Sequence, residues 1–290
     1  MEATQDCYQD VPAEQWNRLV RFRESHPPKR IEVGGLGWEY IACGQGAATL
    51  LLLPGGLRRA ETAFPQIRMF EGTHRLITPG YPPATKIDHI VAGVVDILDR
   101  EGVTRASVLG QSYGGMVAQV LIQSHPKRVD RLVLSSSGPL RASRGMTTLL
   151  SVLTALAAVL PGPVVRGLFK RSLQRILSVP ESESRFWRAY LEELFSLHLS
   201  KADVLSHFLT GQDVLRRYAY AEKEKSQWEG AVLIIGGEKD PVSTEADRNA
   251  LKEVFPQAEV RVVEGCGHTP ALEKPGIYAA LILDFLGRLS

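Results

Sequence analysis

The sequence predicts an α/β protein with a mainly parallel central sheet, helices on both faces and an inserted helical cap. Short apolar runs typical of buried strands alternate with helical patterns in residues 31–139 and again in residues 227–290. This alternation favours parallel strands joined by crossover helices. Residues 140–226 lose the strand pattern and have the pattern of helices. We expect an N-terminal helical extension at 1–30, a core at 31–139 and 227–290, and a cap at 140–226.

Composition excludes several classes of protein. The chain has 290 residues, 44% hydrophobic and 23% charged, with a formal net charge of +2, which is typical of a soluble globular protein. Its basic residues form no stripe interleaved with aromatic side chains, so we expect no nucleic-acid partner. Cys7, Cys43 and Cys266 have no disulfide or zinc spacing. The N-terminus lacks the pattern of a signal peptide, and we expect a cytoplasmic monomer or homodimer that needs no metal or cofactor.

The first part of the chain is expected to form the following elements. Residues 11–25 place apolar side chains near one helical face, and Pro27-Pro28 follows that helix. Two runs around the Gly34-Gly35 turn predict an antiparallel hairpin. Continuous apolar runs predict buried strands, and amphipathic runs predict helices. The expected elements are strands at 31–33, 38–43, 49–53 and 75–78 and helices at 59–71 and 88–100.

Residues 105–124 combine a strand, a tight turn and a helix. An apolar run ends at Leu109, the turn is Gly110-Gln111-Ser112-Tyr113-Gly114, and apolar residues then recur at helical spacing. A serine at the apex of such a turn adopts a strained backbone, and flanking glycines prevent collisions with neighbouring chain. We therefore expect the hydroxyl of Ser112 to be exposed as a nucleophile. A glycine-rich turn capped by serine is the structural alternative.

The remaining elements follow in the same way. A strand at 131–135 leads into the helical segment, whose first helix, 146–160, is apolar nearly all round, as in a helix buried on more than one side. It is too short to span a bilayer, so we expect no stable membrane insertion, although a role at a membrane surface stays open. The apolar character of this helix could equally mean that it lines an apolar substrate pocket or that it only packs against other elements. The last expected elements are strands at 231–235 and 259–263 and helices at 244–255 and 275–289.

Three loops at the expected carboxyl edge of the sheet offer Ser112, Asp240 and His268. A serine hydroxyl needs a base to take its proton, and that base needs a third group to hold its tautomer. His268 lies in a glycine-flanked loop after the last strand, and Asp240 follows a strand and precedes Pro241. The order serine, acid, histidine is typical of one hydrolase architecture. No cofactor is required by this chemistry.

Other residues compete for these roles. Glu238 and Asp247 are alternative acids, but Asp247 should already lie in a helix, and the loop after the preceding strand has no carboxylate. Asp240 could instead serve as a turn or capping residue. Cys266 could be mistaken for a nucleophile, and we interpret it as a small buried residue.

The loop Pro54-Gly55-Gly56 follows a buried strand. Its backbone N–H groups could point at the anion of a tetrahedral intermediate, or the loop could be an ordinary turn. The sequence leaves both interpretations open at this point.

The chain resembles the α/β-hydrolase fold superfamily over residues 31–290. GQSYGG is similar to its nucleophile elbow, GGEKDP to its acid loop and GCGHTPALEKP to its histidine loop. FRESHPPKRI and the Pro-Gly-Gly loop are also similar to the maspardin-like branch. The resemblance implies backbone oxyanion donors at Tyr113 and Gly56, with Leu57 as the alternative. Family members commonly carry His-Gly where this chain has Pro54-Gly55, which puts the geometry of that loop in question.

These observations predict a serine hydrolase that cleaves a carboxylic ester of a small or medium, largely apolar substrate through an acyl-enzyme. Ser112 would attack, His268 would act as base and then acid, and Asp240 would orient it. Hydrolysis of a carbon–carbon bond, a thioester or a lactone, acyl transfer and haloperoxidase-type activity would use the same residues. A non-catalytic binding or adaptor protein with this fold is the alternative from another class.

Overall fold

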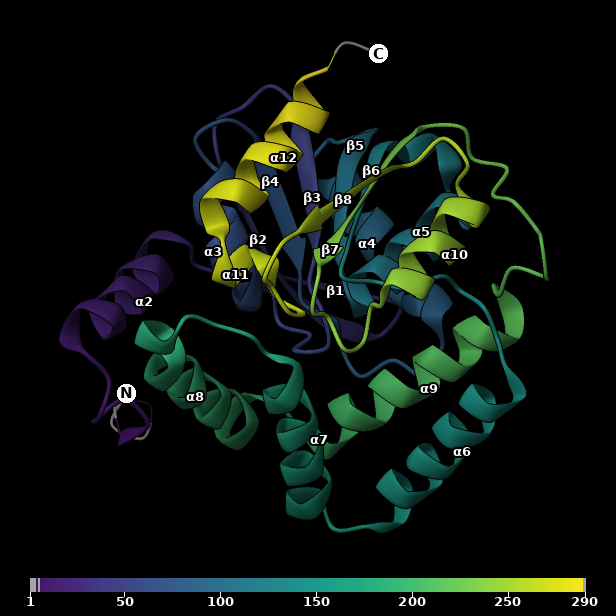
Figure 1. Cartoon of the computed structure of the whole chain (residues 1–290). Coiled ribbons are helices and arrows are strands. Elements are labelled where there is room, and N and C mark those ends of the chain that lie inside the picture. The colour runs from purple at the N-terminus through teal and green to yellow at the C-terminus, as the bar shows by residue number, and fades with distance from the viewer. Residues whose placement is uncertain (1–3, 5, 289–290) are drawn as a thin grey trace.

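The computed structural model describes residue 4 and residues 6–288. A single sheet occupies the middle of the molecule, helices cover both of its faces, and four long helices gather on one side of it (Figure 1). The alternation of strand and helix patterns thus yields the predicted α/β architecture.

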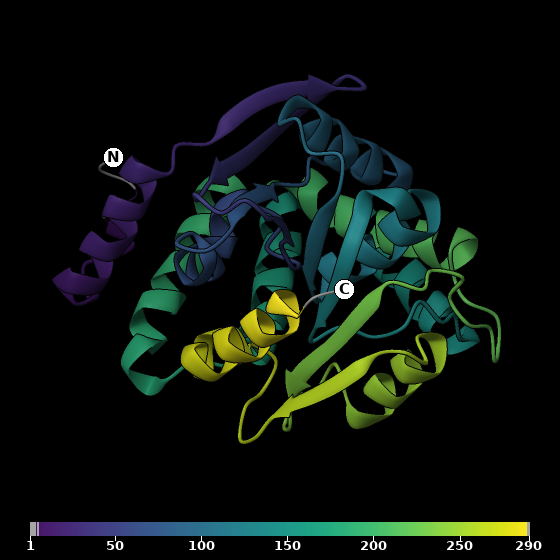
Figure 2. The ribbon, with the colours of Figure 1, turned by 90° about the horizontal axis from the view of Figure 1, so that it is seen from above.

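The sheet has eight strands in the order β1-β2-β4-β3-β5-β6-β7-β8. The hairpin pairs antiparallel, β2 pairs antiparallel with β4, and every later pair is parallel. Figure 2 shows the purple hairpin at one edge and the green and yellow strands at the other. The strands are β1 (Lys29–Val33), β2 (Leu36–Cys43), β3 (Thr49–Leu53), β4 (Arg75–Pro79), β5 (Ala106–Gln111), β6 (Val129–Ser135), β7 (Ala231–Gly237) and β8 (Glu259–Val263).

Each face of the sheet builds its own core. On β3, Leu50 and Leu52 point to one face and Leu51 and Leu53 to the other, because side chains alternate along a strand. The first face is covered by α3 (Phe64–Phe70) and α12 (Pro275–Gly287), and α2 (Ala13–Ser25) packs against α3, where the rings of Phe22 and Phe64 meet. The second is covered by α4 (Ile87–Arg100), α5 (Tyr113–Ser124) and α10 (Glu245–Val254). Burial on both faces explains the continuous apolar runs of the central strands.

The predicted helix at 59–71 begins differently in the structure. A 3₁₀ turn at Ala60–Ala63 comes first, and α3 starts only at Phe64, with Pro65 in its first turn. Proline lacks an N–H and is accommodated only near the start of an α-helix. The proline therefore separates the two helical pieces.

Between β6 and β7 the chain is helical. Its helices are α6 (Arg144–Val159), α7 (Gly162–Ile176), α8 (Ser184–Glu193), a π-helical turn at Leu194–His198, and α9 (Lys201–Arg217). A capping box of Ser200 and Asp203 starts α9. Among the described residues, no helix is long and apolar enough to cross a membrane.

The expectation that helix 146–160 is buried on more than one side is wrong. Only one side of α6 packs against α9, where Gln212 donates hydrogen bonds to the Leu150 carbonyl and to Thr154. The opposite side carries exposed aliphatic residues, among them Leu149 and Val159, which are 57% and 79% exposed. An apolar helix usually buries its surface in a core. This one leaves a large part of it uncovered.

Candidate active site

Ser112 sits at the turn from β5 into α5. Its φ of 50° and ψ of −113° lie in a region that L-residues rarely adopt. A Cβ on Gly114 would lie 2.0 Å from the Leu53 carbonyl oxygen, and one on Gly110 would lie 2.5 Å from the Gly114 carbonyl oxygen. Only glycine fits at these two positions. The strained turn and its flanking glycines are therefore as the sequence predicted.

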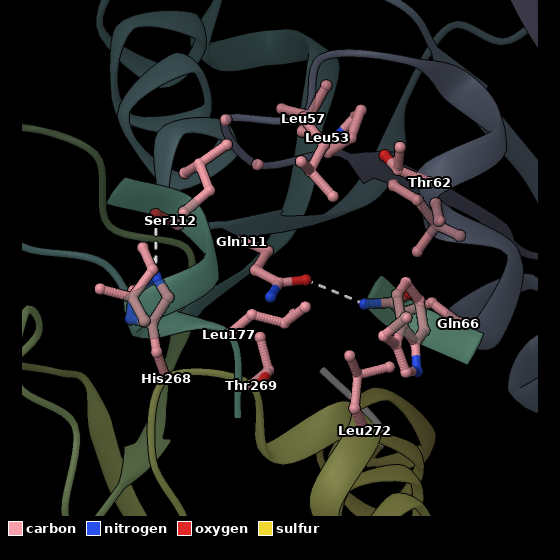
Figure 3. Close-up of a pocket in the computed structure, with 18 of the residues that line it drawn as sticks. Leu53, Leu57, Thr62, Gln66, Gln111, Ser112, Leu177, His268, Thr269 and Leu272 are labelled. Atoms are coloured by element: carbon pink, nitrogen blue, oxygen red, sulfur yellow. Dashed lines mark hydrogen bonds between the residues drawn. The ribbon is translucent and has the colours of Figure 1, made fainter. Parts of the chain in front are cut away.

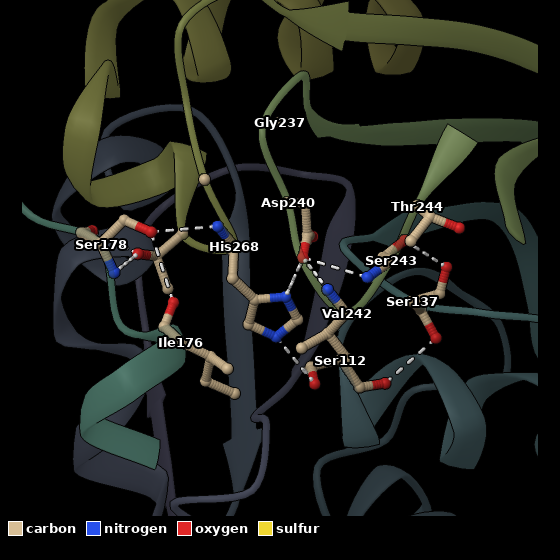
Figure 4. Close-up of polar contacts among 12 residues, drawn as sticks. Ser112, Ser137, Ile176, Ser178, Gly237, Asp240, Val242, Ser243, Thr244 and His268 are labelled. Carbon is tan, nitrogen blue, oxygen red and sulfur yellow. Dashed lines mark hydrogen bonds and ion pairs between the residues drawn. The ribbon is translucent and has the colours of Figure 1, made fainter. Parts of the chain in front are cut away.

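The structure brings Ser112, His268 and Asp240 together (Figure 4). The Ser112 Oγ lies 3.2 Å from His268 Nε2, and His268 Nδ1 lies 2.9 Å from each carboxylate oxygen of Asp240. The side chains of His268 and Asp240 are almost fully buried. Three side chains from different loops, with Ser112 and His268 separated by 156 residues in the sequence, thus form one hydrogen-bonded chain.

Asp240 is held in its ionised form. Burial opposes ionisation, but the hydrogen bond and charge of His268 and the backbone N–H groups of Ser243 and Val242 outweigh it and lower the pKa of Asp240. Those two N–H groups donate to Oδ1 at 3.0 and 2.8 Å. A carboxylate fixed in this way holds the proton of the imidazole on Nδ1, which leaves Nε2 free to face Ser112.

The rival residues have other partners. The Glu238 carboxylate accepts a hydrogen bond from the Gly265 N–H at 2.9 Å. Asp247 forms a capping box with Thr244 at the start of α10. Cys266 is buried, and desolvation together with the nearby Glu273 raises the pKa of its thiol, so the thiolate is disfavoured. None of the three contacts His268 through a hydrogen bond in the described part of the chain.

The Pro54-Gly55-Gly56 loop lies beside the serine. A Cβ on Gly55 would come 3.7 Å from the Ser112 Cβ, and Gly56 and Leu57 line the same pocket as Ser112. Among hydrogen bonds of the described residues, none uses the backbone N–H of Gly56, Leu57 or Tyr113. These N–H groups are therefore available to an anion at this position.

Arg58 follows this loop and is buried, with 1% of its surface exposed. Its backbone φ is 65°, and its guanidinium lies 5.4 Å from the centre of the Tyr113 ring. It donates to the Pro82 carbonyl and the Ser206 hydroxyl, which are neutral acceptors. No carboxylate pairs with it among the described residues. The guanidinium of Arg58 is therefore a buried cation without a carboxylate partner, next in sequence to the Pro54-Gly55-Gly56 loop region.

His207, from α9, packs against the same loop. Its ring stacks on Tyr113 with centroids 4.8 Å apart, and its Cε1 atom would lie 3.4 Å from a Cβ on Gly56. Desolvation, assisted by the charge of Arg58, lowers the pKa of His207 to about 3. A neutral imidazole thus fills the space beside a loop that has no histidine of its own at position 54.

A largely apolar pocket opens at Ser112 and His268 (Figure 3). Many of the apolar side chains that line it come from α7 and the residue after it, α8, α11 (Pro270–Glu273) and the end of the Pro-Gly-Gly loop: Leu57, Leu173, Ile176, Leu177, Trp187, Leu191 and Leu272. Two amides interrupt this lining. Gln66 Nε2 donates to Gln111 Oε1 at 2.9 Å, while Gln66 Oε1 is buried without a hydrogen-bond partner among the described residues.

Comparison with known proteins decides the family. A model of the alpha/beta hydrolase fold matches residues 70–275. This chain belongs to that family. GQSYGG lies at the turn from β5 into α5, GGEKDP begins at the end of β7, and GCGHTPALEKP follows β8.

Relatives and solved structures agree on the fold. The hydrolase is 26% identical over 261 residues to pimeloyl-[acyl-carrier protein] methyl ester esterase of Yersinia enterocolitica, covering 84% of this chain and 95% of the relative. It is 22% identical to 2-hydroxy-6-oxononadienedioate/2-hydroxy-6-oxononatrienedioate hydrolase 2 of Pseudomonas putida, covering 96% and 98%. The enol-lactonase from Burkholderia xenovorans LB400 superposes with a TM-score of 0.73 at 19% identity, covering 90% of this chain and all of that one.

Several residues of this hydrolase's site are not visible in the sequence pattern. Ser178, just after α7, accepts a hydrogen bond from the His268 N–H at 3.1 Å, and its own N–H donates to Thr269 Oγ1 at 3.0 Å. Arg58, His207 and the Gln66–Gln111 pair also come from outside the motifs. They could not be found from spacing, because tertiary packing alone brings them to the pocket. In the sequence Arg58 is only one of two adjacent basic residues, Arg58-Arg59, a pattern that predicts a solvated face; its burial contradicts that expectation.

One group of metal-ligating side chains comes together in the described residues. His26, Cys43 and Glu71 place their ligand atoms within 4.8 Å of one another. His26 Nε2 lies 2.8 Å from Glu71 Oε2, which is a direct hydrogen-bond distance, and burial together with Glu71 raises the pKa of the Cys43 thiol to about 11. This arrangement fits a histidine–carboxylate hydrogen bond beside a protonated thiol. It involves none of the residues that line the Ser112 pocket.

Proposed function

We propose that this protein is a serine hydrolase that cleaves carboxylic esters of small or medium, largely apolar substrates. The observation that carries the proposal is the hydrogen-bonded chain from Ser112 through His268 to Asp240, which opens into the apolar pocket. A hydroxyl paired with an imidazole whose tautomer is fixed by a carboxylate is equipped for nucleophilic attack.

The proposed reaction has two halves. Ser112 Oγ attacks the ester carbonyl carbon while His268 Nε2 takes the hydroxyl proton. The tetrahedral intermediate then collapses, the bond to the alcohol oxygen breaks, and His268 returns the proton to the leaving alcohol. In the second half a water loses its proton to His268 and attacks the acyl-enzyme. Collapse releases the acid and restores the proton to Ser112.

The oxyanion of each intermediate would be stabilised by the N–H groups of Tyr113 and Gly56. Their support is that both are unused by other hydrogen bonds of the described residues and that Gly56 lines the Ser112 pocket. The buried charge of Arg58 would add a favourable potential, because a cation in a low-dielectric site acts over several ångströms. The Arg58 side chain is therefore proposed to assist without touching the substrate.

The four helices α6–α9 are proposed to form a cap over this site. Leu173, Ile176 and Leu177 at the end of α7 line one wall of the pocket, and Trp187 and Leu191 of α8 line another. Apolar walls favour an apolar acyl or alcohol group, since burial of apolar surface is the main source of affinity in such pockets.

Cleavage of a carbon–carbon bond or a lactone is the second candidate. The similarity to a Pseudomonas putida hydrolase named for an oxononadienedioate substrate and to an enol-lactonase favours it. The Gln66–Gln111 pair also offers polar contacts for a substrate that carries oxygen atoms beyond the reacting carbonyl. The same three residues would act in each of these reactions.

Hydrolysis of p-nitrophenyl acetate, butyrate and octanoate tests the proposal. Ser112→Ala and His268→Ala should each lose activity by about 10⁴-fold or more. Cys266→Ser serves as the matched control and should remain active. Equal inactivity of wild type and variants, all folded, would reject simple ester hydrolysis. Partner binding that is unaffected by Ser112→Ala would then favour an adaptor function.

A further inference from the structure

The two helices α6 and α7 carry an uncovered apolar surface. On α6, Leu149, Val152, Leu156 and Val159 recur at helical spacing along one side, and on α7, after the turn, Val164 and Leu168 are exposed as well. These six side chains, which we call the outer cap face, are 45% to 79% exposed. Single exposed aliphatic residues are ordinary, but the row of four along one side of α6 is typical of an interaction site.

The segment that carries the outer cap face has charges of one sign. Residues 131–180 contain no aspartate or glutamate, whereas α7 contains the basic residues Arg166, Lys170, Arg171 and Arg175. Arg171 and Arg175 are exposed and follow Leu168 along α7 at positions three and seven residues later. Lys170 forms an ion pair with Glu192 of α8 at 2.5 Å, which neutralises that glutamate. The face therefore combines aliphatic side chains with unbalanced positive charge.

This combination of aliphatic and basic side chains helps to choose between two binding partners for the face, a second copy of the chain and a lipid surface. In a symmetric dimer formed through the face, both copies would bring their arginines to the same interface, and the segment that carries the face supplies no carboxylate to pair with them. An anionic phospholipid surface instead accepts aliphatic side chains in its acyl region and pairs with arginines at its headgroups. We propose that the outer cap face docks on the surface of an anionic phospholipid bilayer without spanning it.

The position of α7 connects this surface to the pocket. Leu173, Ile176 and Leu177 line the pocket, while Leu168, Arg171 and Arg175 lie on the exposed side of the same helix. Figure 1 shows α6 and α7 meeting in a turn that points away from the sheet. A docked protein would hold its apolar pocket close to the lipid phase. If the proposed ester hydrolysis holds, its substrates would be apolar esters that partition into membranes.

Vesicle flotation tests the docking. The full-length protein is mixed with vesicles of phosphatidylcholine alone or of phosphatidylcholine with phosphatidylglycerol. We expect flotation with the anionic vesicles and its loss at high salt. Val159→Asp combined with Leu168→Asp should lower the bound fraction at least about tenfold, because each aliphatic side chain contributes about that factor. Arg171→Gln combined with Arg175→Gln should remove the preference for anionic lipid.

Two controls separate this proposal from the others. Ile277→Asp changes an equally exposed aliphatic residue on α12 and should float like wild type. The double variant Val159→Asp/Leu168→Asp should hydrolyse water-soluble p-nitrophenyl acetate at the wild-type rate. A wild-type protein that binds anionic vesicles but hydrolyses no ester would reject the proposed ester hydrolysis and leave the docking proposal standing. Absence of flotation with anionic vesicles overturns the proposal. So does a wild-type dimer in solution that the double aspartate variant dissociates.

Discussion

The hydroxyl of Ser178, at the end of α7, accepts a hydrogen bond from the backbone N–H of His268 at 3.1 Å. Thr269 Oγ1 and the Ser178 backbone bond to each other next to it. These hydrogen bonds attach the loop of His268, the proposed catalytic base, to the end of α7, which lines one side of the pocket. We therefore expect this contact to help position the imidazole of His268.

Ser178→Ala should therefore lower kcat/KM by about three- to tenfold, because it leaves a part-buried N–H without its acceptor, a loss of about 1 kcal/mol. Ser178→Thr retains the hydroxyl and should restore most of the activity. Ser172→Ala, an exposed serine on the same helix, is the control. Equal activity of Ser178→Ala and wild type toward all three p-nitrophenyl esters would show that the contact does not position His268.

Arg58→Met should lower kcat about tenfold with little change in KM. The buried guanidinium would act only when negative charge develops on the carbonyl oxygen, and it does so without direct contact, so the loss should be smaller than the ~100-fold typical of a direct donor. Arg59→Met is the control, because Arg59 is partly exposed and paired with Glu39. A change in KM alone would assign Arg58 to substrate binding instead.

His207 should make the fold sensitive to acid. Its pKa is lowered to about 3 in the native state from an ordinary value of 6.5, so the unfolded chain binds more protons between these values. Stability contributed by the neutral ring is full above pH 6.5 and falls as pH decreases toward 3, by up to about 1.4 kcal/mol per pH unit.

Urea unfolding across that pH range measures this contribution. His207→Phe should flatten the decline in the free energy of unfolding, while His89→Gln, which changes an exposed histidine, should leave the slope unchanged. Arg58 is the charged group that contributes to the low pKa of His207, so Arg58→Met should raise that pKa. An unchanged slope in His207→Phe would mean that another group controls acid unfolding.

Gln66→Leu should shift the chain-length preference toward octanoate by several-fold relative to acetate. The substitution replaces a buried amide with an unpartnered oxygen by an apolar side chain, which removes a desolvated polar group from the pocket. Gln66→Glu keeps the size and the acceptor and should not produce this shift. Comparing kcat/KM for the three esters checks the prediction, and a profile identical to wild type would place the acyl chain elsewhere.

The sequence contained most of what positions the site, since the order of strands and helices and the approach of Ser112, Asp240 and His268 agree with expectation. Local patterns succeed here because buried parallel strands and tight glycine turns are determined by nearby residues. The exposed side of α6 was predicted wrongly, because an apolar helix does not reveal which neighbours will cover it. Arg58, His207 and Ser178 depend on contacts between distant segments, which one sequence does not display.

The central claim is that Ser112 is an activated nucleophile. Intact-protein mass spectrometry after treatment with a fluorophosphonate, followed by peptide mapping, tests it most directly. The account predicts one adduct per chain on the peptide that contains Ser112, formed much more slowly in His268→Ala and Asp240→Asn and absent in Ser112→Ala. A folded wild-type protein that forms no adduct, or an adduct that maps to another residue, would contradict it.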